Sequence, residues 1–287
     1  MRPHVCVVGD VGLDVVAKLA GPVVLGQDTR ARVQVTPGGA GGNTAAWLAR
    51  EDLDVSLIAR VGDDEAGRTA AAELGAAGID CLFAVDPTLP TCCVVILAGE
   101  DGERTMMADR GANKTFCPGD VRLPEREGRG HLHLSGYVIL DDDSRAGGLA
   151  ALAAAKAAGW TTSVDPQASQ HIFTVGAENF LSWVQGVDML LPNDSEVAAL
   201  GGVGAALQSA QIVVVTHGRR GASWYSPTVR LTVPAAAEHQ ADSTGAGDAF
   251  NAGLLASWLA GESAIDALTR GVLSGTSACA KIGARPG

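Results

Sequence analysis

The chain has 287 residues, enough for one large α/β domain or two small ones, and 47% of them are hydrophobic. This composition is typical of a globular protein and excludes a disordered one. The formal net charge of −11, with no block of lysine and arginine to offset it, argues against a nucleic acid or an anionic membrane as partner. It does not forbid an anionic substrate, because a local pocket can carry the opposite sign.

Cysteine spacing and hydropathy indicate the compartment. The six cysteines are scattered, without CxxC spacing or a His/Cys cluster that would hold zinc. We interpret them as reduced, mostly buried thiols of a cytoplasmic protein. The N-terminal apolar run is too short for a signal peptide, and no segment approaches the ~18 apolar residues of a membrane span. The sequence therefore predicts a soluble, cytoplasmic protein.

Short apolar runs alternate with alanine-rich segments of helical period along the chain. This alternation predicts an α/β domain of three layers, a sheet covered on both faces by helices. Strands are expected at 5–8, 55–58, 132–134, 161–164, 189–191 and 212–215, and helices at 43–50, 67–77, 144–158 and 195–200. Gly78 and Gly159 fall where helix C-caps are expected. No repeat or low-complexity linker marks a second domain, so residues 1–287 are expected to form one.

Two stretches, at about 15–35 and 81–109, depart from this rhythm. They contain the short alternating runs "ARVQV", "CLFAV" and "TCCVVIL", separated by turn residues. The pattern predicts a small second sheet that covers either an active site or the identical sheet of a partner. The alternative interpretation is an ordinary antiparallel extension of the main sheet.

The stretch "DSTGAGDAF", residues 242–250, places Gly245, Ala246 and Gly247 between two carboxylates and continues into apolar residues at helical spacing. A helix that begins near Gly245 offers free N–H groups and a partial positive charge, and the glycines let a ligand come close. The stretch therefore predicts an anion hole. Helix capping alone is the alternative interpretation of its acids. Only one acid is needed to cap, so Asp248 could accept a proton from a hydroxyl that attacks the anion, as phosphoryl transfer requires.

Two further stretches are candidates for binding the acceptor. In "GGAGGN", Gly38 and Gly39 let substrate oxygens approach the backbone, and Asn43 can exchange hydrogen bonds with hydroxyls. In "VVGDVGLD", Asp10 and Asp14 follow the first strand, where open α/β sheets bind ligands, and carboxylates can hold sugar diols. A flexible turn and solvated turn acids are the alternative interpretations.

The loops after two later strands are candidates for binding a nucleotide. Asn193 and Glu196 lie three residues apart in "PNDSE" and could hold a hydrated divalent ion. Thr216, Gly218 and Gly221 in "THGRRG" could present hydroxyl and N–H groups to phosphates. A helix cap and an ordinary glycine loop remain as alternatives. No GxxxxGK[ST] sequence occurs, so a nucleoside triphosphate would bind without a P-loop.

Taken together and in this order, these residues resemble the ribokinase-like (PfkB) family of carbohydrate and nucleoside kinases over nearly the whole chain. Residues 242–248 resemble the family's C-terminal signature, D-T-x-G-A-G-D, and residues 38–45, "GGAGGNTA", resemble its N-terminal signature. "VGDDEAG", residues 61–67, also recurs in the family. The resemblance implies a ribokinase-like three-layer α/β/α domain with a small β-sheet lid, which in many members also forms a dimer interface.

The resemblance also implies a role for each matched position. Asp248 would be the base that deprotonates the acceptor hydroxyl, and the turn from Gly245 to Gly247 would hold the γ-phosphate of ATP. Asn193 and Glu196 would bind Mg²⁺ and phosphates, and Thr216, Gly218 and Gly221 would bind the nucleotide. Asp14, Gly39 and Asn43 would bind the acceptor. Asp242 and Thr244 match positions that form a monovalent-cation site, as for K⁺, in some members.

The expected acceptor is a sugar hydroxyl, as in a primary CH₂OH group. A nucleoside is the first alternative, with Phe83, Phe116, Tyr137 and Phe173 as candidate platforms for its base. An acidic keto-sugar is another, because Arg110 could extend from the lid toward a carboxylate or phosphate. Arg110 could equally be a surface arginine. A non-catalytic sugar-binding or sensor protein on the same fold is the alternative of a different class.

Overall fold

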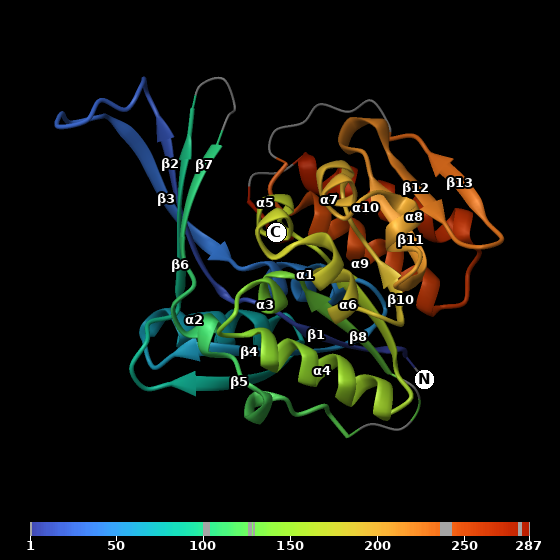
Figure 1. The fold of residues 1–287 in the computed structure, drawn as a ribbon. Coiled ribbons are helices and arrows are strands. Elements are labelled where there is room, and N and C mark those ends of the chain that lie inside the picture. The colour runs from blue at the N-terminus through green and yellow to red at the C-terminus, as the bar shows by residue number, and fades with distance from the viewer. Residues whose placement is uncertain are drawn as a thin grey trace.

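Within the residues that the computed structural model describes (2–99, 104–125, 128, 130–235, 243–280 and 283–286), the centre is a nine-stranded sheet (Figure 1). In spatial order its strands are β13 (Arg230–Val233), β12 (Ala222–Tyr225), β11 (Ala210–Thr216), β10 (Val187–Leu190), β9 (Thr161–Asp165), β8 (Gly130–Ser135), β1 (His4–Val8), β4 (Asp54–Gly62) and β5 (Asp80–Asp86). β12 is antiparallel to both of its neighbours, and the strands from β11 to β5 are parallel. The carboxyl ends of the parallel strands therefore meet at one edge.

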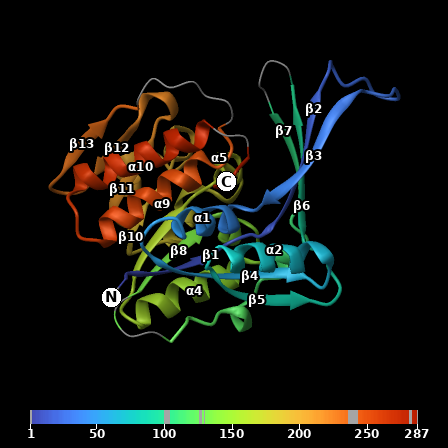
Figure 2. The ribbon, with the colours of Figure 1, turned by 180° about the vertical axis from the view of Figure 1, so that it is seen from behind.

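Helices cover both faces of this sheet (Figures 1 and 2). The helices that pack on one face are α1 (Ala40–Leu48), α2 (Glu65–Ala76), α9 (Ala246–Leu259) and α10 (Ala264–Cys279). Those on the other face are α3 (Tyr137–Leu140), α4 (Arg145–Ala157), α5 (Ser169–Val175), α6 (Ala177–Trp183), α7 (Asp194–Ala199) and α8 (Val203–Ala206). Short 3₁₀ turns occur at η1 (Gly111–Thr115), η2 (Pro118–Asp120) and η3 (Gly218–Arg220).

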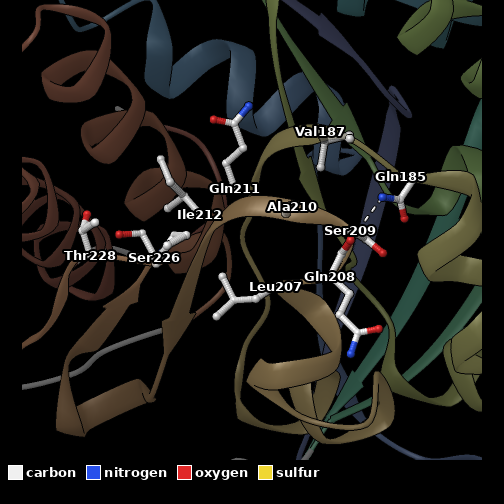
Figure 3. A pocket seen from close by; sticks show the side chains of 12 residues that line it. Gln185, Val187, Leu207, Gln208, Ser209, Ala210, Gln211, Ile212, Ser226 and Thr228 are labelled. Atoms are coloured by element: carbon white, nitrogen blue, oxygen red, sulfur yellow. Dashed lines mark hydrogen bonds between the residues drawn. The ribbon is translucent and has the colours of Figure 1, made fainter.

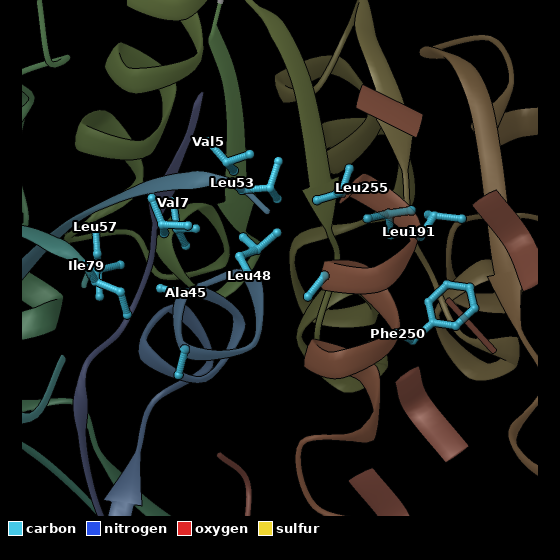
Figure 4. Packing of buried hydrophobic residues seen from close by; sticks show 14 of the residues in the cluster. Val5, Val7, Ala45, Leu48, Leu53, Leu57, Ile79, Leu191, Phe250 and Leu255 are labelled. Atoms are coloured by element: carbon cyan, nitrogen blue, oxygen red, sulfur yellow. The ribbon is translucent and has the colours of Figure 1, made fainter. Parts of the chain in front are cut away.

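The two faces hold separate hydrophobic clusters, which explains the continuous apolar runs of the parallel strands. Successive side chains of a strand point to opposite faces, so Val5 and Val7 of β1 join the cluster under α1, where Figure 4 shows them near Leu48. Cys6 and Val8 join the opposite cluster. All six predicted strands and all four predicted helices are present, with ends shifted by a few residues. The three-layer prediction is confirmed.

The two predicted helix C-caps are confirmed. Gly78 and Gly159 follow α2 and α4 with positive φ values of 85° and 70°, as helix C-caps do. The six cysteines form no disulfide among the described residues; Cys6, Cys92 and Cys279 are buried, Cys81 and Cys93 are half-buried, and Cys117 is exposed. None of the described helices has the length and apolarity that crossing a bilayer requires.

A second sheet extends away from the main body as a lid (Figures 1 and 2). Its strands, in spatial order, are β3 (Ala31–Gly38), β2 (Gly12–Leu19), β6 (Cys92–Ala98) and β7 (Arg104–Asp109). One predicted lid strand belongs elsewhere: "CLFAV", residues 81–85, lies in β5 and pairs in parallel with β4 at the edge of the large sheet. In β5, Cys81 and Phe83 pack against one hydrophobic cluster and Leu82 against the other. The apolar pattern of a short strand does not identify its pairing partner, so the sequence could not assign it to a sheet.

Candidate functional site

The site lies at the carboxyl ends of the parallel strands, where α9 begins. Gly245 precedes the helix with a φ of 75°, a left-handed conformation that glycine adopts without strain. A Cβ atom on Gly245 would lie 2.2 Å from the carbonyl oxygen of Ala284, so no side chain fits there. Apart from its chain neighbours and the backbone of its own helix, no atom lies within 4 Å of the corresponding position on Gly247, so this position is open to a ligand. The predicted glycine turn and helix start are confirmed, and the anion hole stays a prediction.

Asp248 lies on the first turn of α9, where a neighbouring helix holds its carboxylate. The hydroxyl of Thr44, on α1, donates a hydrogen bond of 2.7 Å to Oδ1 of Asp248. Burial raises the pKa of Asp248 to about 7; the Thr44 hydrogen bond opposes this rise, and the negative charge of Asp165 adds to it. A carboxylate with a pKa near neutrality is suited to accept a proton. Sequence reasoning missed Thr44, although it directly follows Asn43 in the N-terminal signature.

A cavity of about 200 Å³ opens beside Asp248. The residues that line it are Asp165, Gln167, Leu191, Asn193, Glu196, Thr216, Gly245, Gly247, Asp248 and Asn251. They come from the ends of β9, β10 and β11 and from the start of α9, so the parallel topology gathers segments that are far apart in the chain. Six of the predicted site residues line this one cavity.

Asn193 and Glu196 form a capping box at the start of α7. Oδ1 of Asn193 accepts from the backbone N–H of Glu196 at 3.0 Å. The Glu196 carboxylate accepts from the backbone N–H of Asn193 at 2.8 Å and from its side-chain amide at 2.6 Å. The capping interpretation is therefore correct, and the same two residues also line the cavity.

Asp165 shares the cavity with Glu196 and is a residue that sequence reasoning missed. Asn251 donates a hydrogen bond of 2.7 Å to Oδ2 of Asp165, and the backbone N–H of Gln167 donates one of 3.0 Å to Oδ1. Burial raises the pKa of both carboxyl groups, and the charge of Asp165 raises that of Glu196 further. The signal was present, because Asp165 ends β9 at the edge where Asp10 follows β1.

A divalent cation near the two carboxylates would relieve their repulsion. Among the described residues, no group of three acidic, histidine or cysteine side chains converges to hold a metal ion. An ion bound at Asp165 and Glu196 would therefore complete its coordination with water and phosphate oxygens, as Mg²⁺ commonly does in nucleotide sites.

A second group of predicted residues lies where the lid joins the main sheet. The Asp14 carboxylate lies against the backbone of Gly38, where a Cβ atom would come within 2.2 Å of Oδ1. Gly39 is the N-cap of α1 with a φ of 84°, and Asn43 follows on the same helix. Burial raises the pKa of Asp14 to about 6, and the positive charge of Arg285 opposes this rise. The structure thus brings together the predicted acceptor residues, whose binding role stays a prediction.

Asp10 and Arg110, both predicted to bind the acceptor, form an ion pair with each other. Nε and Nη2 of Arg110 donate to the two oxygens of Asp10 at 2.9 and 2.8 Å, and Nη1 lies 2.7 Å from Oδ2 of Asp141. Asp10 is only 7% exposed, so it is not a solvated turn acid either. The two side chains satisfy each other's charge, and their role in binding a substrate stays a prediction.

The remaining predicted residues lie around the cavity or beyond it. Thr216 ends β11 and lines the cavity. Gly218 and Gly221 lie just past it, at η3, with positive φ values of 57° and 97°. Thr244 lies in the turn before α9. Asp242 lies outside the described residues, so the cation site at Asp242 and Thr244 stays a prediction.

Arg285 contacts the acceptor group from the segment 283–286, and sequence reasoning missed it. Its Nε donates a hydrogen bond of 3.1 Å to Oδ1 of Asn43, and its Nη2 donates one of 2.9 Å to the carbonyl of Gly38. The indole N–H of Trp47 donates one of 2.9 Å to the carbonyl of Ala284 and so fixes the segment. No local pattern signals such an arginine, because its partner Asn43 is 242 residues away.

A larger hollow of about 530 Å³ lies at the opposite, amino ends of β10 and β11 (Figure 3). Its lining includes Gln185, Leu207, Gln211 and Ser226, and none of the side chains that line it is titratable. Because acid–base chemistry needs a proton acceptor, we assign the site to the smaller cavity.

Comparison with known sequences gives one family. The sequence matches the family described as "pfkB family carbohydrate kinase" over residues 2–287. It is 33% identical over 229 residues to "ATP-dependent ribose-1-phosphate kinase" of Halopiger xanaduensis, an alignment that covers 77% of this chain and 73% of that protein. The family that the sequence motifs resemble is therefore confirmed.

Solved structures agree on the fold. Adenosine kinase from Sinorhizobium meliloti has a TM-score of 0.86 at 23% identity, with 100% of this chain and 96% of that chain covered. A putative Ribokinase II in complex with ATP and Mg²⁺ from E. coli has a TM-score of 0.85 at 22% identity, with 98% and 94% covered. These similarities confirm the predicted ribokinase-like fold.

Proposed function

Because the chain belongs to the pfkB family of carbohydrate kinases, we propose that it transfers the γ-phosphoryl group of ATP to a hydroxyl of a small sugar-like acceptor, with Asp248 as the general base. One observation carries the assignment of the base. The Asp248 carboxylate, which Thr44 fixes and burial brings to a pKa of about 7, lies directly beside the turn from Gly245 to Gly247. A proton acceptor and an anion-binding turn thus face the same cavity.

The proposed reaction has one chemical step. Asp248 accepts the proton of the acceptor hydroxyl while the hydroxyl oxygen forms a bond to the γ-phosphorus. The bond between the γ-phosphorus and the bridging oxygen breaks, and ADP leaves with the electron pair. Backbone N–H groups of the Gly245–Gly247 turn and the positive end of α9 stabilise the charge on the transferring group.

The proposal includes Mg²⁺ at Asp165 and Glu196, with Asn193 nearby. Bound Mg²⁺ supplies positive charge that offsets the negative charge of the phosphates. The raised pKa values of the two carboxyl groups support a cation there, and a structure with the same fold was solved with ATP and Mg²⁺. A monovalent cation such as K⁺ at Asp242 and Thr244 belongs to the same proposal and rests on the family resemblance alone.

We propose a sugar hydroxyl, as in a CH₂OH group, as the acceptor in preference to a nucleoside. Asp14 and Asn43 offer carboxylate and amide groups to hydroxyls. Of the aromatic side chains considered for a nucleoside base, Phe116 is 3% exposed in the core, and Phe83 packs against the core from the edge strand β5. Neither is free to stack on a base. Phe173 is 63% exposed and Tyr137 is partly buried, so the preference for a sugar rests on Asp14 and Asn43.

The proposal extends to a homodimer formed through the lid and to the cytoplasm as compartment. Val33 and Val35 of β3 are 59% and 63% exposed, and Met106 of β7 is also exposed, so the lid offers apolar surface that a second lid could cover. The free cysteines support a reducing compartment.

The test is ATP-dependent ADP release across a panel of sugars, sugar phosphates, sugar acids and nucleosides, with Mg²⁺ present. We expect turnover with at least one class and its loss in Asp248→Asn, while ATP still binds. Retained sugar binding with no turnover for any acceptor would favour the non-catalytic sugar-binding protein instead.

A further inference from the structure

Arg285 places a positive charge at the acceptor group that no carboxylate of the described residues pairs with. A guanidinium has five N–H donors. Two of them bind Asn43 and Gly38, and the other three have no acceptor among the residues that the structure describes. Arg110 and Arg60 differ, because each pairs with two carboxylates. Arg285 is therefore positioned by neutral groups and keeps its charge available.

The surrounding backbone is shaped for this guanidinium. A Cβ atom on Gly42 would lie 2.5 Å from Nη2 of Arg285, so the glycine leaves the space that the guanidinium occupies. The backbone of Ala284 packs against Gly245 and accepts the hydrogen bond from Trp47. Arg285 is thus held between the start of α1, where the acceptor residues lie, and the start of α9, where the phosphoryl group would lie.

The charges around Arg285 indicate what it binds. Glu73, Asp14 and Asp248 lie within its electrostatic influence, Glu73 most strongly, and the two aspartates near the site would repel an anionic acceptor. A neutral sugar needs only hydroxyl-binding groups such as Asp14 and Asn43. Arg285 is partly buried, so a ligand whose anionic oxygens bind its unused donors would offset the free-energy cost of keeping the guanidinium partly out of water. The planar arrangement of its donors matches phosphate and carboxylate groups.

We propose that Arg285 binds an anionic substituent of the acceptor, a phosphate or a carboxylate, so that the substrate class is a sugar phosphate or sugar acid and not a neutral sugar. This inference rests on the proposed function, because it concerns the acceptor of the same site. It makes Arg285 the residue that selects the acceptor.

The first experiment compares kcat/KM for matched acceptors: D-ribose against its 1- and 5-phosphates, D-fructose against its 1- and 6-phosphates, and D-glucose against D-gluconate. We expect the parent to prefer an anionic member. In Arg285→Gln the ratio of anionic to neutral kcat/KM should fall about 10- to 100-fold, the value of a lost charge-assisted hydrogen bond. Arg285→Lys should keep part of the preference.

Two further variants separate charge from position. Gly42→Ala keeps the charge but displaces the flexible end of Arg285, so the same ratio should fall. Arg68→Gln removes an equal charge from the exposed face of α2 and should leave the ratio unchanged. If Arg285→Gln lowers kcat/KM equally for both members of a pair, Arg285 serves the transferring phosphoryl group or the fold, and the proposal is overturned. A parent enzyme that prefers neutral sugars overturns it as well.

Calorimetry without ATP separates this inference from the proposed function. We expect inorganic phosphate and the preferred sugar phosphate or sugar acid to bind the parent at least about tenfold more tightly than Arg285→Gln. If this holds while no acceptor is phosphorylated, the kinase proposal fails and the anion site stands. If sugars are phosphorylated while the parent and Arg285→Gln bind the anion equally tightly, the anion site fails and the kinase proposal stands.

Discussion

Replacing Asp248 by asparagine removes the proposed proton acceptor and retains the shape of the site. The amide oxygen can still accept the hydrogen bond that Thr44 donates at 2.7 Å, so α1 and α9 remain joined there. Loss of a general base should lower kcat on the order of 10²- to 10⁴-fold, which corresponds to about 2.7–5.5 kcal/mol of activation free energy. The dissociation constant for ATP should change little, because the variant keeps the glycine turn and the cavity.

The pH dependence of kcat/KM is a second test of Asp248 as the base. Only the ionised carboxylate accepts a proton, and burial raises its pKa to about 7. The kcat/KM of the parent should therefore rise tenfold per pH unit below about pH 7 and level off above it. The residual activity of Asp248→Asn should lack this acidic limb.

Asp248→Asn should stabilise the fold while it lowers the activity. Because the pKa of Asp248 is higher in the folded state than its ordinary 3.8, the ionised group destabilises the fold increasingly as pH rises from about 4 to 7. Asp248→Asn removes that cost, so its Tm should exceed the parental Tm at pH 8 and equal it near pH 4. A shift of three pKa units sets an upper limit of about 4 kcal/mol, and the partial exposure of Asp248 reduces the expected gain to roughly 1–2 kcal/mol.

The kcat and its pH dependence are measured by a coupled assay of ADP release between pH 5.5 and 9. Calorimetry measures ATP binding, and thermal unfolding at two pH values measures Tm. A variant that keeps kcat within about threefold of the parent would refute Asp248 as the base. Loss of kcat together with loss of ATP binding, or a lower Tm at pH 8, would mean that the substitution disrupts the site.

Three other predictions test the neighbours of this residue and the lid. Thr44→Val removes a hydrogen bond that lowers the pKa of Asp248, so the acidic limb of kcat/KM should move to higher pH, whereas Thr44→Ser should leave it in place. Glu196→Gln should raise the Mg²⁺ concentration for half-maximal activity, and an unchanged Mg²⁺ titration would remove this residue from the metal site. Val35→Glu should convert a lid-mediated dimer to a monomer, as measured by light scattering. The control Val85→Glu, on β5, adds the same charge and should leave the dimer intact. A parental mass for Val35→Glu would contradict the lid interface.

The fold was largely predictable because its signals are local. Strand 5–8 is buried on both faces and therefore apolar throughout, and helix 246–259 follows a glycine whose φ of 75° few other residues adopt. The alternation of apolar and polar residues does not predict to which sheet residues 81–85 belong. The pairing partner of a strand lies outside its own sequence, so a short apolar run does not show which sheet it joins.

The site was predictable to the extent that its residues share a contiguous motif. Gly245 and Asp248 belong to one turn, and Asn193 and Glu196 belong to one capping box, so their proximity follows from local geometry. Partnerships across the chain gave no such signal. Arg110 lies 100 residues from Asp10, and nothing in either segment indicates that the two neutralise each other.

The same reasoning explains why the sequence does not identify the acceptor. A positive charge near a site predicts an anionic ligand only if no carboxylate pairs with it, and pairing is a property of the folded chain. Arg110 drew attention because it lies in a lid segment, yet its charge is satisfied by Asp10 and Asp141. Arg285 lies outside the predicted motifs, and yet its position, held by Asn43 and Gly38, leaves its charge available. The choice between a neutral and an anionic acceptor therefore depends on which arginine the fold leaves without a carboxylate.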